Sequence, residues 1–327
     1  MGSRTASALG FEVDDATLRK LGRHGPILGL VGLYVAFTLL TDRFLSYDNQ
    51  LNILRQVSII GILAIGSTFP ILCSEIDLSI AQMMEFTGVL IAALATGSLV
   101  AGELPVVVAV AAGFLAALFL GGISGFITSR FEVPSFITTL AMLFLADGLG
   151  LIVSDNRPII GLPESLTWLG GQSTFGFPNI ALTFLGLLVV SQLVLSRTRL
   201  GLYIYAVGGD RQAAARMGIN VARIRMGVLM ISAAFTVIAA VVSLGRIGSA
   251  IPTMGANLLL PPIAAVILGG ANLFGGSGNM VGTLVGVLIL GVLSNGLNLL
   301  GVDPAGQLVA QGIVLMIAVL ANVVGRQ

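Results

Sequence analysis

Ten apolar runs separated by short polar connections constrain this chain more than any other feature of its sequence. Each run holds few charges and approaches the length that an α-helix needs to cross a bilayer. Charged residues make up only 9% of the chain, against about 25% in soluble domains. We therefore predict an all-α polytopic membrane protein with about ten transmembrane helices. The runs cover residues 26–40, 53–73, 78–96, 104–128, 134–153, 180–196, 227–244, 258–274, 280–297 and 307–324.

The distribution of basic residues predicts how these helices are oriented. With the N-terminus in the cytoplasm, ten spans place twelve of the sixteen basic residues on the cytoplasmic side. Basic residues next to spans tend to stay on that side, so both termini are expected there. The predicted organisation is a cytoplasmic N-terminal lead-in (1–25), a single transmembrane domain (26–324) and a cytoplasmic tail (325–327).

The most polar stretch, residues 197–226, connects the sixth and seventh spans and holds six basic residues. Asp210 is suited to be a helix N-cap, residues 211–217 favour a helix, and Gly218 can adopt the left-handed conformation that ends one. These residues predict one short basic helix on the cytoplasmic surface, with the shape of a docking element. An ordinary positively charged loop is the alternative.

The connection between the fifth and sixth spans, residues 154–178, is long enough to hold more than a turn. Such a segment can carry a short interfacial helix that meets a partner on the outside. Trp168 lies in this segment and is expected to anchor it at the membrane interface.

Seven polar residues in or beside the apolar runs are candidates for a translocation path, because ionisable groups in a bilayer are costly and usually face a cavity or a partner. Asp77 or Ser79 could instead cap a helix, whereas Glu85 lies well inside a run. Asn295 and Asn298 share one helix face, where they could bond a neighbouring helix or a polar solute. The seven are Glu75, Asp77, Ser79, Gln82, Glu85, Asn295 and Asn298.

Motifs for ATP hydrolysis and metal binding are missing from the sequence. Lys20 is the only lysine and follows Arg19, so the phosphate loop G-x-x-x-x-G-K-[ST] cannot occur. Cys73 and His24 are the single cysteine and histidine, which excludes an intrachain disulfide and a multi-cysteine metal site. The glycine-rich residues 269–278 are interpreted as a tight turn. The chain is expected to bind no cofactor and to be a transporter subunit driven by another chain.

Six stretches of the sequence carry a resemblance to a known family: 71–72, 76–79, 133–140, 201–220, 263–276 and 295–302. Together they resemble the permease subunits of the ribose, xylose and galactose type of bacterial ABC importers. Gln212-Ala213-Ala214 with Gly218 is also similar to the E-A-A-x-x-x-G pattern of importer permeases, with Gln in place of Glu. The resemblance implies that this helix couples to an ATPase, with Ala214 on the face toward the partner. Residues implied in coupling are Asp210, Arg211, Gln212, Ala213, Ala214, Arg216 and Gly218.

The resemblance also implies partners and a location. The partners would be a second copy or a paralogue of the permease, a cytoplasmic ABC ATPase with two nucleotide-binding modules, and a periplasmic sugar-binding protein. ATP and Mg would be bound by the ATPase. The location would be the bacterial inner membrane, and the solute a monosaccharide or a similar polyhydroxylated molecule.

Departures from the family pattern leave the solute open. Ser74 and Glu75 stand where the family usually has two glycines, and residues 259–262 lack an acid that is usually present. A nucleoside or a furanosyl signalling molecule is therefore an alternative solute. A secondary carrier that uses Glu75, Asp77 or Glu85 as a proton or cation site is an alternative mechanism, and a membrane scaffold is a third.

Overall fold

The computed structural model describes residues 15–324, which form thirteen helices and one antiparallel hairpin of β1 (Ser173–Thr174) and β2 (Phe177–Pro178). Each of the ten predicted apolar runs contains one helix. The helices are α1 (Asp15–Leu40), α2 (Tyr47–Leu72), α3 (Ile80–Ala95), α4 (Val106–Arg130), α5 (Ser135–Ser154), α6 (Glu164–Gly171), α7 (Asn179–Arg197), α8 (Arg199–Gly209), α9 (Arg211–Arg216), α10 (Val221–Ile247), α11 (Leu260–Leu268), α12 (Met280–Leu299) and α13 (Pro304–Val324).

Six helices within the described residues are long and apolar enough to cross a membrane, namely α2, α4, α5, α7, α10 and α12. Shorter apolar helices occur in α1, α3 and α13. The run at 258–274 differs most from its prediction, because α11 has only nine residues. Pro261 and Pro262 lie in its first turn, and Gly269 ends it. At 1.5 Å per residue, nine residues cannot cross the hydrocarbon core.

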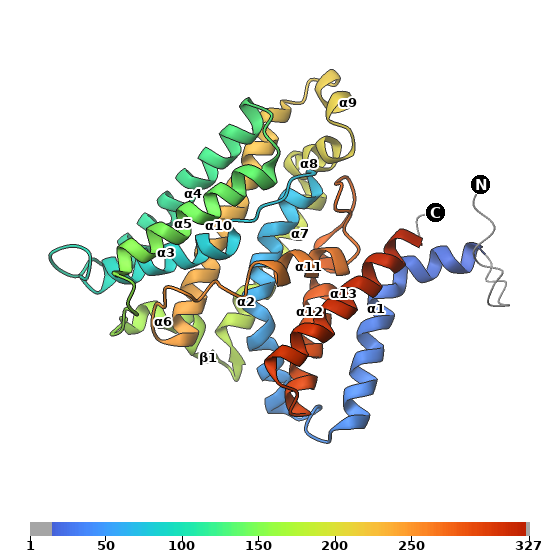
Figure 1. Ribbon diagram of the computed structural model, residues 1–327, viewed down its shortest axis with the longest axis horizontal. Coiled ribbons are helices and arrows are strands. Elements are labelled where there is room, and N and C mark those ends of the chain that lie inside the picture. The colour runs from blue at the N-terminus through green and yellow to red at the C-terminus, as the bar shows by residue number, and fades with distance from the viewer. Residues whose placement is uncertain (1–14, 325–327) are drawn as a thin grey trace.

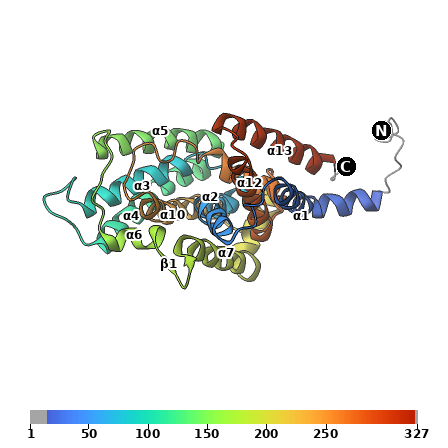
Figure 2. The same cartoon turned by 90° about the horizontal axis from the view of Figure 1, so that it is seen from below.

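Helices α2 and α10 form the centre of the molecule. Helix α10 packs against α2, α3, α4 and α6, while α2 also packs against α7, α11 and α12. Most of α2 is buried, and residues 57–72 are largely apolar on all sides, as expected for a buried helix. Figure 1 shows α3, α4 and α5 on one side of α2 and α1, α12 and α13 on the other. Figure 2 shows α5 and α13 on one face and α7 on the opposite face.

The polar elements gather at two opposite ends of the molecule. Helices α8 and α9 lie at one end, and α6 with the β1–β2 hairpin lies at the other (Figure 1). Helix α6 confirms the short helix predicted within residues 154–178, and the side chain of Trp168 on it is exposed. The segments before α6 and after α10 are joined by reciprocal backbone hydrogen bonds between Ile159 and Ala250, each of 2.9 Å. Residues 1–14 and 325–327, which hold most of the predicted lead-in and the whole predicted tail, lie outside the described part.

Candidate functional site around helix α9

Helix α9 is held by caps at both of its ends. The carboxylate of Asp210 accepts hydrogen bonds of 2.8 and 3.0 Å from two backbone N–H groups of the first turn. At the other end, Gly218 has a φ of +81°, and the N–H of Ile219 donates to the carbonyl of Ala214 at 3.1 Å. This is the glycine-ended pattern that closes many helices. The predicted N-cap, Asp210, and the predicted terminal glycine, Gly218, are confirmed. The helix ends at Arg216, one residue before the predicted end at residue 217.

The two faces of α9 have different surroundings. Ala214 is buried in the chain's own hydrophobic core, which corrects the expectation that it faces a partner. The opposite face is exposed and presents the side chains of Gln212, Ala213 and Arg216. Met217, which directly follows the helix, is 83% exposed. A partner that binds α9 would therefore contact this exposed face and Met217, while Ala214 packs the helix against the rest of the chain.

Three segments of the chain meet where α8 ends, directly before α9. The hydroxyl of Ser74 donates to the carbonyl of Gly208 at 3.0 Å, and the N–H of Gly276 donates to the carbonyl of Leu72 at 3.0 Å. A Cβ atom at Gly208 would collide with the Leu72 carbonyl, so only glycine permits this close approach. The end of α2, the end of α8 and the glycine-rich loop before α12 are thus joined, as expected for a closely packed turn.

A buried carboxylate connects α9 to the membrane helices. Glu75, between α2 and α3, forms ion pairs with Arg211 of α9 at 2.8 Å and with Arg225 of α10. We call these three residues the Glu75 cluster. The side chains are 1% exposed for Glu75, 8% for Arg225 and 41% for Arg211. Arg211 also donates to the carbonyl of Ser74 at 3.0 Å. A buried carboxylate that two guanidinium groups share fixes three separate segments relative to one another.

The segment after Glu75 is extended and is held by side chains of α5. The N–H of Ile76 donates to the hydroxyl of Ser135 at 2.9 Å, and the N–H of Leu78 donates to the hydroxyl of Thr139 at 3.0 Å. Buried backbone donors need such partners when no helix or sheet supplies them. The segment between Glu75 and the start of α3 is thus anchored to α5 at two points.

Asp77 and Ser79 are both buried and bond to each other. One carboxylate oxygen of Asp77 accepts from the N–H of Ser79 at 2.9 Å and from its hydroxyl at 2.6 Å. The Ser79 side chain makes no capping bond to α3, although Ser79 occupies the N-cap position. The capping expected of these residues is therefore replaced by a local turn that closes the extended segment.

Glu85 lies one turn and a half into α3 and is 2% exposed. One of its carboxylate oxygens accepts from the N–H of Gly255 at 3.0 Å, in the loop that follows α10. Its other oxygen and the side-chain oxygen of Gln82 find no hydrogen-bond partner in the described part of the chain. Buried acceptors without a donor are costly. Gln82 and Glu85, three residues apart on α3, thus each keep one acceptor oxygen without a donor among the described residues.

The two asparagines on α12 have different roles in the packing. Asn295 is buried and exchanges two hydrogen bonds, of 2.9 and 3.0 Å, with Asn49 of α2. This reciprocal pair joins two helices. Asn298, three residues later, is exposed. Of the two asparagines expected to act together, only Asn295 thus bonds a neighbouring helix, and Asn298 lies at the surface.

Sequence reasoning missed four residues that hold these groups: Arg225, Ser135, Thr139 and Asn49. Arg225 was counted only as a basic residue of the cytoplasmic loop. Its pairing with Glu75 joins residues 150 positions apart, and charge alone does not reveal which partners meet. Ser135 and Thr139 lie four residues apart on one helix face, a spacing that could have indicated that both face the same neighbour.

Comparisons with known proteins place this geometry in context. Residues 49–319 match the family described as branched-chain amino acid transport system, permease component. The ribose import permease protein of Bacillus subtilis is 40% identical over 310 residues, which cover 94% of each chain. That of Escherichia coli K12 is 37% identical over 300 residues, covering 90% of this chain and 92% of the relative. The fructose import permease protein of Rhizobium meliloti is 34% identical over 328 residues, covering 94% of this chain and 89% of the relative.

Proposed function

We propose, from the premise that this chain belongs to the branched-chain amino acid transport system permease family, that it is the permease subunit of an ATP-driven importer for a monosaccharide. The family description names amino acids, but the similar permeases quoted above are named for ribose and fructose. The observation that carries the proposal is the capped helix α9, whose exposed face is free while its buried side is tied through Glu75 to the membrane helices.

The proposed topology has ten membrane segments with both termini in the cytoplasm. Six long apolar helices and the shorter helices in the remaining runs support it. Helices α3 and α11 would cross only part of the membrane, and the non-helical segments before them would complete the passage. The positions of α9 and α6 at opposite ends of the molecule (Figure 1) agree with one cytoplasmic and one external surface. Labelling of single cysteines in a Cys73→Ser background tests this topology. Position 216 should be protected and position 157 labelled in intact cells.

Coupling would begin at the exposed face of α9. A cytoplasmic ABC ATPase with two nucleotide-binding modules would contact Gln212, Ala213, Arg216 and Met217, and it would hold ATP and Mg while this chain binds no cofactor. Closure of the ATPase would move α9 and, through Arg211, the carboxylate of Glu75. Because Glu75 also binds Arg225, the movement would reach α10 and the extended segment before α3 together.

The other partners would be a second copy or a paralogue of the permease and a periplasmic sugar-binding protein. The surface around α6 supports the latter contact, because an open depression there is lined by Glu164, Ser165, Trp168 and Gln172. Carboxylate, amide and indole groups suit a polar protein partner at the rim of a membrane. We assign the binding-protein contact to this end of the molecule.

The solute path would pass Gln82 and Glu85 on α3. Their two free acceptor oxygens could bond the hydroxyl groups of a sugar. Asp77, Ser79 and Asn295 already use their polar groups within the chain, so we assign them to the support of the path. A nucleoside or another furanosyl molecule presents the same hydroxyl groups and would be distinguished only by direct measurement.

Reconstitution of the complete importer tests the proposal. The permease, its ATPase and the sugar-binding protein are placed in vesicles, and uptake of labelled ribose, fructose and a nucleoside is measured with and without ATP. We expect uptake of a monosaccharide that requires both ATP and the binding protein. Uptake by the permease alone that follows an imposed proton or sodium gradient would contradict the proposal and indicate a secondary carrier.

A further inference from the structure

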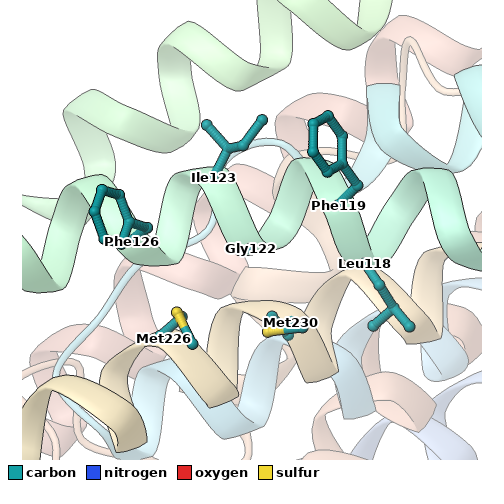
Figure 3. Close-up of a pocket in the computed structure, with 7 residues that line it drawn as sticks. All are labelled: Leu118, Phe119, Gly122, Ile123, Phe126, Met226 and Met230. Carbon is teal, nitrogen blue, oxygen red and sulfur yellow. The ribbon is translucent and has the colours of Figure 1, made fainter.

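An open apolar groove of about 350 Å³ lies between α4 and α10. Figure 3 shows its lining, in which Gly122 leaves a gap in the row of side chains along α4. Phe119 and Phe126 beside this gap are 68% and 52% exposed. Every lining residue is apolar, so the groove suits a hydrocarbon chain. The lining residues are Leu118, Phe119, Gly122, Ile123, Phe126, Met226 and Met230.

Two arginines stand at one end of this groove. The helices run antiparallel, because Gly125 of α4 lies against Met226 near the start of α10, while Gly113 lies against Val237 further along. The end of α4 and the start of α10 therefore come together. Arg130 follows Phe126 by one helical turn, and Arg223 precedes Met226 by about one turn. Both arginine side chains are exposed, so the groove has an apolar length and a basic end.

We infer that this groove binds a phospholipid with an anionic headgroup. An acyl chain would lie over Gly122, between Phe119 and Phe126, and the headgroup phosphate would meet Arg130 and Arg223. Arginine binds phosphate through two parallel N–H donors, and basic residues at the membrane surface attract anionic lipids. The charge of the two arginines selects an anionic lipid over a zwitterionic one.

The lining of the groove favours a flexible chain over a packed helix. Close helix contacts in membranes need several small residues in a row, and Gly122 is the only one in the groove. The two methionines, Met226 and Met230, have adaptable side chains that follow an irregular apolar ligand. An acyl chain can fit such a surface without ordering a second protein against it.

Native mass spectrometry with defined lipids tests the headgroup contact. The purified permease is released from micelles that contain equal amounts of phosphatidylglycerol and phosphatidylcholine, and retained lipids are counted. We expect a preference of about thirtyfold for phosphatidylglycerol, the factor that two basic residues at a membrane surface contribute. The Arg130→Gln/Arg223→Gln variant should lose this preference, while Arg197→Gln/Arg199→Gln, which removes two exposed arginines from the end of α7 and the start of α8, should keep it. An equal loss in both variants would overturn the inference.

A second variant tests the groove itself. A Cβ atom at Gly122 meets only the sulfur of Met230, at 4.0 Å, so Gly122→Leu fills the groove without a backbone collision. We expect it to abolish the retained phosphatidylglycerol, whereas Gly186→Leu on the exposed surface of α7 should not. Unchanged retention in Gly122→Leu would overturn the site. Cross-linking between Phe119→Cys residues of two copies, in a Cys73→Ser background, would show a protein in the groove and overturn it equally.

Discussion

Glu75 and Glu85 lie ten residues apart on either side of the start of α3, and both are buried, but their surroundings are opposite. Glu75 binds two arginines, one of them almost fully buried. Glu85 receives a single backbone N–H, and one of its oxygens has no partner in the described part of the chain. Two buried acids of one segment thus differ in their partners: Glu75 is bound by charged side chains, and Glu85 only by a backbone donor.

The difference follows from which groups can reach each acid. Glu75 stands just after the end of α2, where α9 and α10 bring Arg211 and Arg225 from the polar end of the molecule. The only donor that reaches Glu85 among the described residues is the backbone N–H of Gly255, and no basic side chain pairs with it there. An acid that two arginines share resists removal, because a buried arginine would lose its counter-charge. The unpaired oxygen of Glu85 has no such dependent partner among the described residues.

The largest expected effect is that of Glu75→Gln. Arg225 would remain buried without a counter-charge, and breaking a buried ion pair costs about 3–5 kcal/mol. We expect a large loss of thermal stability in detergent, measured by unfolding of the purified permease. The control is Asp155→Asn, which breaks the exposed pair with Arg157 at 3.7 Å and should change stability by less than about 1 kcal/mol. If Glu75→Gln and Asp155→Asn lowered stability equally, the buried pairs of Glu75 would contribute no more than an exposed pair, and the contrast with Glu85 would be lost.

A smaller effect is expected for Gly255→Ala, which tests the contact of Glu85. The new Cβ atom would lie 2.5 Å from the carbonyl oxygen of Ala81 and 3.2 Å from the carboxylate of Glu85. The loop must move away, at a cost of about 1–3 kcal/mol for overpacking. We expect lower stability and slower uptake in reconstituted vesicles. Gly148→Ala, where a Cβ atom meets nothing within 4 Å, is the control and should behave like the wild type.

Gly218→Val tests whether the ATPase needs the correctly ended helix α9, which carries Arg211 of the Glu75 cluster. Valine at a φ of +81° is strained by about 1–2 kcal/mol. We expect the protein to insert normally but to bind the ATPase more weakly in pull-down measurements. Gly209→Ala, at a position with open space and no positive φ, is the matched control. Normal ATPase binding by Gly218→Val would indicate that α9 is only a connector.

The smallest effect on stability is expected for Glu85→Gln. Glutamine keeps an acceptor for the N–H of Gly255, so we expect a change in unfolding free energy below about 1 kcal/mol. Uptake should nevertheless fall, because the free oxygen that would meet the solute is changed. Transport is measured in vesicles across a range of pH, with Glu103→Gln in an exposed loop as the control. Normal transport at every pH would make Glu85 a structural residue.

The sequence predicted the local features of the site well and its long-range contacts poorly. Asp210 and Gly218 act within a few residues of themselves, so the caps of α9 follow directly from residue type. The partners of Glu75 cannot be derived from residue type in this way. Arg211 and Arg225 reach Glu75 only because the helices that carry them pack beside it. The buried position of Ala214 depends on the core beneath α9, which no local pattern describes.

The same distinction applies to the fold. Apolar length located a helix in every predicted run, because hydrophobicity and backbone hydrogen bonding are local requirements. It overestimated the length of α11, because two prolines lie in the first turn of this helix and Gly269 ends it after nine residues. The extended segment before α3 was also missed, since its hydrogen bonds go to Ser135 and Thr139 on another helix.

In the proposed mechanism, the Glu75 cluster transmits movement from α9 to the membrane helices. The Glu75→Met/Arg225→Met variant tests it most directly, because apolar replacement of a buried ion pair is often neutral for stability. ATP hydrolysis by the complete importer is measured with and without the solute-loaded binding protein. We predict that the complex assembles and keeps its basal hydrolysis but loses stimulation by the loaded binding protein. Full stimulation in a correctly assembled complex would contradict the claim.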